Sequence, residues 1–335
     1  MDNLTHSLVG ALLGQAGLKR KTGLAMPALI IGANLPDVDA ACFFWLDGVK
    51  HLGFRRGITH GPPALVLLPL ILAGLPYGFD RWQAKRGKRP EGRLPVHFGW
   101  LFTLSFIGCL THPALDWLNV YGIRLLEPFS SRWFYGNTLF IIDIWLWLGM
   151  GLATWFSLKQ EKQAKAWRWP AITALGFSVL YIGANFVTST ATQAAYSINS
   201  KARSNADDSI DANSDIPQSV FIASPPPFFA FQRDIIVGDR NDYWIIPAGE
   251  LPMPGNAKRV SESRCKWPDF DSMRRDNPDL DAFLFWSRTP FVESDGNGAM
   301  LLRDARFYDP RARDRFTVAL PDVTCEPIGE EPAVE

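Results

Sequence analysis

Histidines and aspartates that could bind a metal ion recur at the edges of apolar segments. Each of three histidines, among five in the chain, directly follows a threonine, and aspartates occupy the same kind of place. Ionisable side chains are costly within membrane-length apolar runs and are usually functional there. The pattern therefore predicts a metal site at one face of a bilayer, with these candidate ligands: His6, Asp37, Asp39, His60, His112 and Asp116.

The ligand types indicate a hydrolytic centre. Imidazoles and carboxylates suit zinc, manganese or non-haem iron, and the absence of cysteine ligands argues against a purely structural zinc site. Three histidines and up to three aspartates exceed the needs of one four-coordinate ion, so the surplus either binds a second ion or orients the imidazoles. We expect one or two divalent ions, zinc foremost, that activate water near neutral pH.

Prolines interrupt the segments that carry two of the carboxylates. The spacing His112-x-x-x-Asp116 places two ligands on one helical face, because residues four apart are neighbours. Pro113 in that segment, and Pro36 beside Asp37, should kink or restart a helix. Broken backbone at membrane depth is tolerated where it lines a cavity, which fits a site.

Four of the polar residues have two interpretations each. Asp39 either joins the site, as a ligand or as a catalytic base, or caps a helix. Arg55 and Arg56 either steer an anionic group of the substrate, such as a phosphate or carboxylate, or are plain juxtamembrane cations. Asp143 is either a site member or a buried polar anchor.

The apolar segments that must position these residues predict a multi-pass bundle of about six helices. Runs at 62–79, 96–116, 138–158 and 170–190 can each cross a bilayer, which needs about 20 apolar residues. Two shorter segments, 3–18 and 24–46, come first as short spans or re-entrant pieces. Basic stretches at 19–21, 81–93 and 159–168 should be cytoplasmic by the positive-inside rule. Alternating the spans then puts all six candidate ligands toward the outer face.

The composition changes after the last span. We expect a membrane-embedded helical domain over 1–195, a polar linker over 196–218 and a small β-rich extracytoplasmic domain over 219–335. Its predicted strands are 219–224, 228–237, 243–246, 282–286, 299–308 and 315–320. Cys265 and Cys325 could form a disulfide there, whereas Cys42 and Cys109 suit an apolar core. The formal net charge of zero gives no reason to expect nucleic-acid binding.

As an ordered set, the motifs resemble those of the YdjM-like bacterial family of inner-membrane, metal-dependent hydrolases. The resemblance covers roughly the first 190 residues, and the C-terminal region is similar to the β-rich extension of some members. It implies a membrane-embedded metal-dependent hydrolase. The motifs that carry it are Asp-x-x-Thr-His6, Asn34-x-Pro-Asp37-x-Asp39, Arg56-Gly-x-Thr-His60, Thr111-His112-x-x-x-Asp116 with Asn119 and Gly122, and Tyr135-Gly-Asn137 leading to Asp143-Ile-Trp145.

The order of His, Asp, His and His-x-x-x-Asp is also similar to that in zinc-dependent phospholipase C and related single-strand nucleases. This likeness implies metal-assisted attack on a phosphodiester. One zinc would take Asp37 or Asp39 with His60, His112 and Asp116, while His6 and Asp116 would touch another. A later His-x-x-x-Glu that would complete a three-metal site is missing from the sequence, and Asp143 is the candidate substitute.

We therefore expect a multi-pass inner-membrane metallohydrolase that acts on a lipid-linked or other membrane-proximal ester or phosphoester at the outer leaflet. The bilayer is its expected partner, and the C-terminal domain would cover the site or select substrate. The alternative is a non-catalytic scaffold that uses metal to pin its helices and presents the β-rich domain to a partner. A transporter ranks last, because it predicts charged groups near mid-membrane in paired broken helices.

Overall fold

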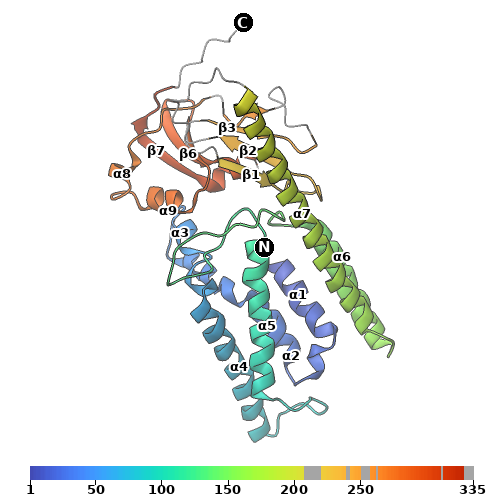
Figure 1. The fold of residues 1–335 in the computed structure, drawn as a ribbon. Coiled ribbons are helices and arrows are strands. Elements are labelled where there is room, and N and C mark those ends of the chain that lie inside the picture. The colour runs from blue at the N-terminus through green and yellow to red at the C-terminus, as the bar shows by residue number, and fades with distance from the viewer. Residues whose placement is uncertain (207–219, 239–241, 250–256, 262, 311, 328–335) are drawn as a thin grey trace. The chain divides into compact units, whose positions relative to one another are not determined.

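The computed structural model describes residues 1–206, 220–238, 242–249, 257–261, 263–310 and 312–327 (Figure 1). The chain forms two compact units. The first comprises Met1–Ala41, Arg56–Val187 and Pro227–Ala230, and the second comprises Cys42–Arg55, Thr188–Pro226 and Phe231–Glu335. The division thus falls within the last long helix, and a short stretch of the N-terminal half belongs to the second unit.

The first unit is helical, as expected. Its helices are α1 (Asn3–Gln15), α2 (Ala25–Asn34), α4 (Pro62–Lys85), α5 (Phe98–Trp117), α6 (Ile144–Lys162) and the start of α7 (Arg168–Ala206) (Figure 1). α2 continues into a 3₁₀ segment, η2 (Leu35–Phe44), and a second one, η3 (Ile58–His60), precedes α4. The α-helix thus ends at Asn34, beside Pro36, where the sequence predicts an interruption.

Among the residues that the structure describes, four segments are long and apolar enough to cross a membrane: Ala25–Phe44, Pro62–Lys85, Phe98–Trp117 and Arg168–Ala195. The expectation of about six helices was wrong, because the described residues form nine α-helices. The additional helices α3 (His51–Phe54), α8 (Phe270–Met273) and α9 (Pro278–Trp286) are short. α1 has 13 residues and a length of about 20 Å, less than the roughly 30 Å of a hydrocarbon core.

Glycines let α2 pack closely against both α1 and α5. A Cβ atom on Gly10 would lie 2.7 Å from the carbonyl oxygen of Leu29, and one on Gly108 would lie 2.6 Å from the same oxygen. A Cβ atom on Gly32 would lie 2.7 Å from the carbonyl oxygen of Ser105. Small residues at helix contacts allow such close backbone approach in membrane proteins. The three helices therefore have a fixed spacing, which matters because α1 and α5 carry candidate ligands.

The second unit contains two antiparallel sheets, which confirms the β-rich C-terminal region. One sheet has the order β1-β2-β3-β4 and the other the order β5-β6-β7 (Figure 1). Cys265 and Cys325 form a disulfide. The strands are β1 (Val220–Ser224), β2 (Asp234–Gly238), β3 (Tyr243–Ile246), β4 (Lys258–Arg259), β5 (Pro290–Ser294), β6 (Ala299–Asp304) and β7 (Thr317–Thr324).

Two local predictions for the C-terminal half were wrong. The strand predicted at 282–286 lies in α9, where Asn277 caps the helix by accepting the Leu280 N–H and Pro278 occupies the first turn. This cap and proline are helix-start signals that outweigh the apolar run after them. The linker predicted over 196–218 begins too early, because α7 extends to Ala206; residues 207–218 lie outside the described part of the chain.

Candidate metal centre

Four chain segments bring five of the six predicted ligands together. His6 comes from α1, Asp37 from η2, His60 from η3, and His112 and Asp116 from α5. The ligand atoms of His6, His112 and Asp116 lie within 4.8 Å of one another, and so do those of Asp37, His60 and His112. His112 belongs to both groups, so the two groups form one continuous cluster.

The three imidazoles direct the same ring atom at Asp116. The distance from Nε2 to the nearer carboxylate oxygen is 3.4 Å for His6, 3.7 Å for His60 and 3.6 Å for His112. The rings of His6 and His112 are stacked, with centroids 3.8 Å apart. All three Nε2 atoms are buried and have no hydrogen-bond partner among the residues that the structure describes. Buried polar atoms in proteins almost always have a partner, so these three nitrogens are candidates for binding a water molecule or an ion.

The hydrogen bond at Nδ1 of His112 determines what its Nε2 atom offers. Nδ1 donates to the carbonyl oxygen of Ala33 at 2.7 Å, and a carbonyl can only accept. In the neutral ring Nε2 therefore carries a lone pair, which faces Asp116 and also Asp37, whose Oδ1 atom is 3.7 Å away. The Nε2 lone pair of His112 and the carboxylate oxygens are all electron-rich, so a cation between them would stabilise the arrangement.

Asp39 lies outside both groups of ligand atoms and orients His60 instead. The hydroxyl of Thr59 donates to Oδ2 of Asp39 at 3.2 Å, so its oxygen is left to accept from Nδ1 of His60 at 2.9 Å. Nε2 of His60 then carries the lone pair. Oδ2 of Asp39 also accepts the backbone N–H of Arg56 at 2.7 Å. Carboxylates behind ligating histidines commonly fix the tautomer and the ring orientation in this way.

Arg56 contacts the carboxylate of Asp116, one of the candidate ligands. Its Nε atom lies 3.0 Å from Oδ2 of Asp116, and its Nη1 atom donates to Oδ1 of Asn119 at 3.1 Å and to the carbonyl oxygen of Gly122 at 3.2 Å. The amino group of Met1 pairs with the other oxygen of Asp116. These contacts favour a positioning role for Arg56 over the steering role that the sequence predicts.

The other two polar candidates have partners of their own. Arg55 belongs to the second unit, where its guanidinium lies 5.5 Å from the ring centroid of Phe43. Asp143 caps α6 by accepting two backbone N–H groups at 3.0 Å, among them that of Trp145, and it accepts the hydroxyl of Tyr181 at 3.0 Å. The contacts of Asp143 favour the buried anchor over site membership.

Two residues that sequence reasoning left without a role position His6. Asp2 caps α1 by accepting the N–H groups of Leu4 and Thr5, and it also accepts the indole N–H of Trp147 at 3.1 Å. Trp147 lies on α6, so this bond ties the first turn of α1 to a distant helix. The cap was detectable from an aspartate just before the helix, whereas the sequence holds no signal for the indole contact.

Comparison with known proteins identifies a family for this chain but no individual relative. No curated protein and no solved structure matches the chain. The likeness to zinc-dependent phospholipase C thus stays a prediction from motif order. The family model described as YdjM inner membrane protein matches residues 1–192, which include all six predicted ligands and more than half of the chain. The chain therefore belongs to the YdjM inner membrane protein family.

Proposed function

We propose that this membrane protein is a metal-dependent hydrolase that acts on a lipid-linked or membrane-proximal ester, foremost a phosphoester, at the outer face of the inner membrane. One observation carries the proposal: three buried imidazoles present Nε2 atoms without partners to the carboxylates of Asp37 and Asp116. Catalytic zinc sites use this mixture of imidazole and carboxylate ligands.

The donors fit a single ion best. Nε2 of His112 has one lone pair and Nδ1 is committed to Ala33, so this ring can serve one ion although it belongs to both groups. His112 would bind that ion either with His6 and Asp116 or with Asp37 and His60, because these are the two groups whose ligand atoms lie within 4.8 Å of one another. Zinc held there would supply water activation near neutral pH and polarisation of the ester. Asp39 and Thr59 would keep the His60 ring oriented, and Arg56 would keep Asp116 in place.

Two features support the outer face. The basic stretches at 19–21, 81–93 and 159–168 are typical of cytoplasmic loops and leave the ligands on the opposite side. The disulfide between Cys265 and Cys325 is typical of an oxidising compartment, which supports an extracytoplasmic second unit. A site at this depth would meet esters that are held in the membrane.

A non-catalytic scaffold is the second candidate, and the burial of the ligands favours it. The side chains of His6, His60 and His112 are 0% exposed, so water and substrate would need an opening to reach them. Ligands from α1, η2, η3 and α5 would then pin these segments together around the ion. Structural metal sites stabilise folds in this way.

The experiment measures metal content and hydrolysis on the same preparation. The full chain, purified in detergent, is analysed for metals by mass spectrometry and is assayed against phosphodiester and phospholipid esters. The hydrolase predicts about one equivalent of metal and an activity that His112→Ala removes. Thr111→Val is the matched control, because its hydroxyl donates to the carbonyl of Gly108 and not to an imidazole. Stoichiometric metal without hydrolysis identifies the scaffold, and absence of metal from the wild-type protein overturns both.

A further inference from the structure

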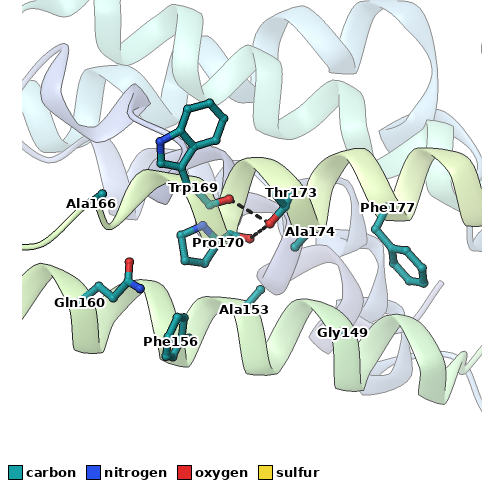
Figure 2. A pocket seen from close by; sticks show the side chains of 10 residues that line it. All are labelled: Gly149, Ala153, Phe156, Gln160, Ala166, Trp169, Pro170, Thr173, Ala174 and Phe177. Atoms are coloured by element: carbon teal, nitrogen blue, oxygen red, sulfur yellow. Dashed lines mark hydrogen bonds between the residues drawn. The ribbon is translucent and has the colours of Figure 1, made fainter.

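A groove with an apolar lining runs between α6 and α7 of the first unit, as Figure 2 shows. It has a volume of about 650 Å³. Small residues on both helices leave this space open, namely Gly149 and Ala153 on α6 and Ala174 on α7. Aromatic rings line the rest, including those of Trp169 and Phe177.

The groove offers almost no polar group to a ligand. Besides the indole N–H of Trp169, two of its lining side chains carry polar groups. The hydroxyl of Thr173 donates to the carbonyl oxygens of Trp169 at 2.9 Å and Pro170 at 3.1 Å, so it is satisfied within its own helix (Figure 2). The other polar side chain, Gln160, lies in the last turn of α6. Such a lining suits a hydrocarbon chain with its polar group at the Gln160 end.

The length of the groove corresponds to one leaflet. Its lining on α6 runs from Gly149 to Gln160, a rise of about 16 Å at 1.5 Å per residue. Half of a bilayer's hydrocarbon core is about 15 Å thick. An acyl chain that starts beside Gln160 would therefore extend along the groove to about the bilayer midplane.

The end of the groove next to Gln160 is basic. Four exposed cations form a basic turn, because they lie in the last turn of α6, in the connection to α7 and at the start of α7; the acidic residue in this stretch, Glu161, pairs with Lys19. Basic clusters between helices on the cytoplasmic side attract anionic lipid head groups. The four cations are Lys159, Lys162, Lys165 and Arg168.

We propose that this groove is a binding site for an anionic glycerophospholipid of the inner leaflet, with one acyl chain between α6 and α7 and the phosphate on the basic turn. The apolar lining selects the chain, and the four cations select the charge of the head group. The site involves none of the candidate metal ligands, so this proposal stands or falls independently of the hydrolase.

Native mass spectrometry of the full chain tests the proposal. The protein in detergent is mixed with equal amounts of phosphatidylglycerol and phosphatidylcholine that have identical acyl chains. Phosphatidylglycerol should be retained roughly tenfold better, because the basic turn favours the anionic head group. Equal retention of the two lipids would overturn the proposal.

Variants separate the groove from the basic turn. Ala174→Phe fills the groove and should remove most of the retained phosphatidylglycerol. Leu152→Phe adds an aromatic ring to an exposed α6 position outside the groove and should leave retention unchanged. The double variant Lys162→Gln and Lys165→Gln keeps the groove and should abolish the preference for phosphatidylglycerol. Unchanged retention in Ala174→Phe, or an unchanged preference in the double variant, would refute the site.

Discussion

Oδ2 of Asp39 lies 3.6 Å from Nδ1 of His60, and the hydroxyl of Thr59 bridges the two groups. The bridge fixes the tautomer in which Nε2 of His60 can bind a metal. Each of the three candidate histidines follows a threonine, but the threonines differ in what they contact. The hydroxyl of Thr5 donates to Asp2 and that of Thr111 to a backbone carbonyl.

Removal of the Thr59 bridge should weaken metal binding. Thr59→Val keeps the shape of the side chain and loses the hydroxyl, so we expect metal affinity to fall about 10- to 100-fold, as for other groups that orient metal ligands. Competition with a fluorescent zinc chelator measures the change. Thr111→Val serves as the control and should bind metal like the wild type; equal affinities in the two variants would exclude a role for the bridge.

Loss of the Arg56 guanidinium should destabilise the first unit. In Arg56→Met the carboxylate of Asp116 loses one of its charge partners while it stays buried, and breaking a buried pair costs about 3 kcal/mol or more. The thermal unfolding midpoint of the protein in detergent should fall, and added zinc should restore part of the loss. Arg81→Met, an exposed position on α4, is the control. Equal midpoints for both variants would contradict the contact.

A methyl group at Gly108 should disturb the contact between α5 and α2. In Gly108→Ala the new Cβ would meet the carbonyl oxygen of Leu29, so we expect a loss of about 1 to 3 kcal/mol from overpacking. Metal affinity should fall as well, because His112 depends on the neighbouring Ala33 carbonyl. Gly151→Ala on α6, with nothing within 4 Å of its Cβ, should be neutral or stabilising. Unfolding midpoints and metal titrations compare the two.

The buried pair of Asp304 and Arg306 should make the C-terminal sheet sensitive to acid. Burial alone would raise the pKa of Asp304, but the Arg306 guanidinium and hydrogen bonds from Ser287 and Thr289 together lower it to about 2. The unfolded-state pKa is about 3.9, so the carboxylate contributes about 2 kcal/mol above pH 4, and this contribution is lost as the pH falls toward 2. Protection factors for amide exchange in β6, which correct for the intrinsic pH dependence of exchange, should fall over that range.

Asp304→Asn tests this assignment. The variant should have lower protection factors in β6 than the wild type at pH 7, and these should change little further between pH 4 and pH 2. Asp314→Asn, at an exposed carboxylate that also pairs with an arginine, is the control and should follow the wild-type profile. A wild-type profile in Asp304→Asn would show that another group governs the acid response.

The disulfide offers a test of topology in cells. If the second unit is extracytoplasmic, Cys265 and Cys325 should be oxidised and resist alkylation until a reductant is added. Cys42 and Cys109 are buried and should react after denaturation with or without reductant. A mass-shift alkylation assay on whole-cell extracts distinguishes these cases. Alkylation of all four thiols in the denatured, unreduced protein would argue for a reducing compartment.

The sequence was sufficient to select residues that meet in the cluster, because charged groups stand out in apolar segments. It could not assign their roles. Asp37 groups with His60 and His112, whereas Asp39 contacts Thr59 behind the His60 ring, and this difference depends on contacts between distant segments. The indole bond from Trp147 to Asp2 has no local signal either. By contrast, α9 could have been predicted, because an asparagine followed by a proline, here Asn277 and Pro278, is typical of the start of a helix.

The burial of the cluster also bears on how the molecule assembles. His6 leaves the ribosome long before His112, and Asp37 and His60 follow between them. The cluster of candidate ligands thus forms only after α5 has been synthesised and has packed against α2. A metal ion would therefore bind only after this half of the chain is complete. A chain that is truncated before α5 would lack His112 and Asp116 and would not bind the ion.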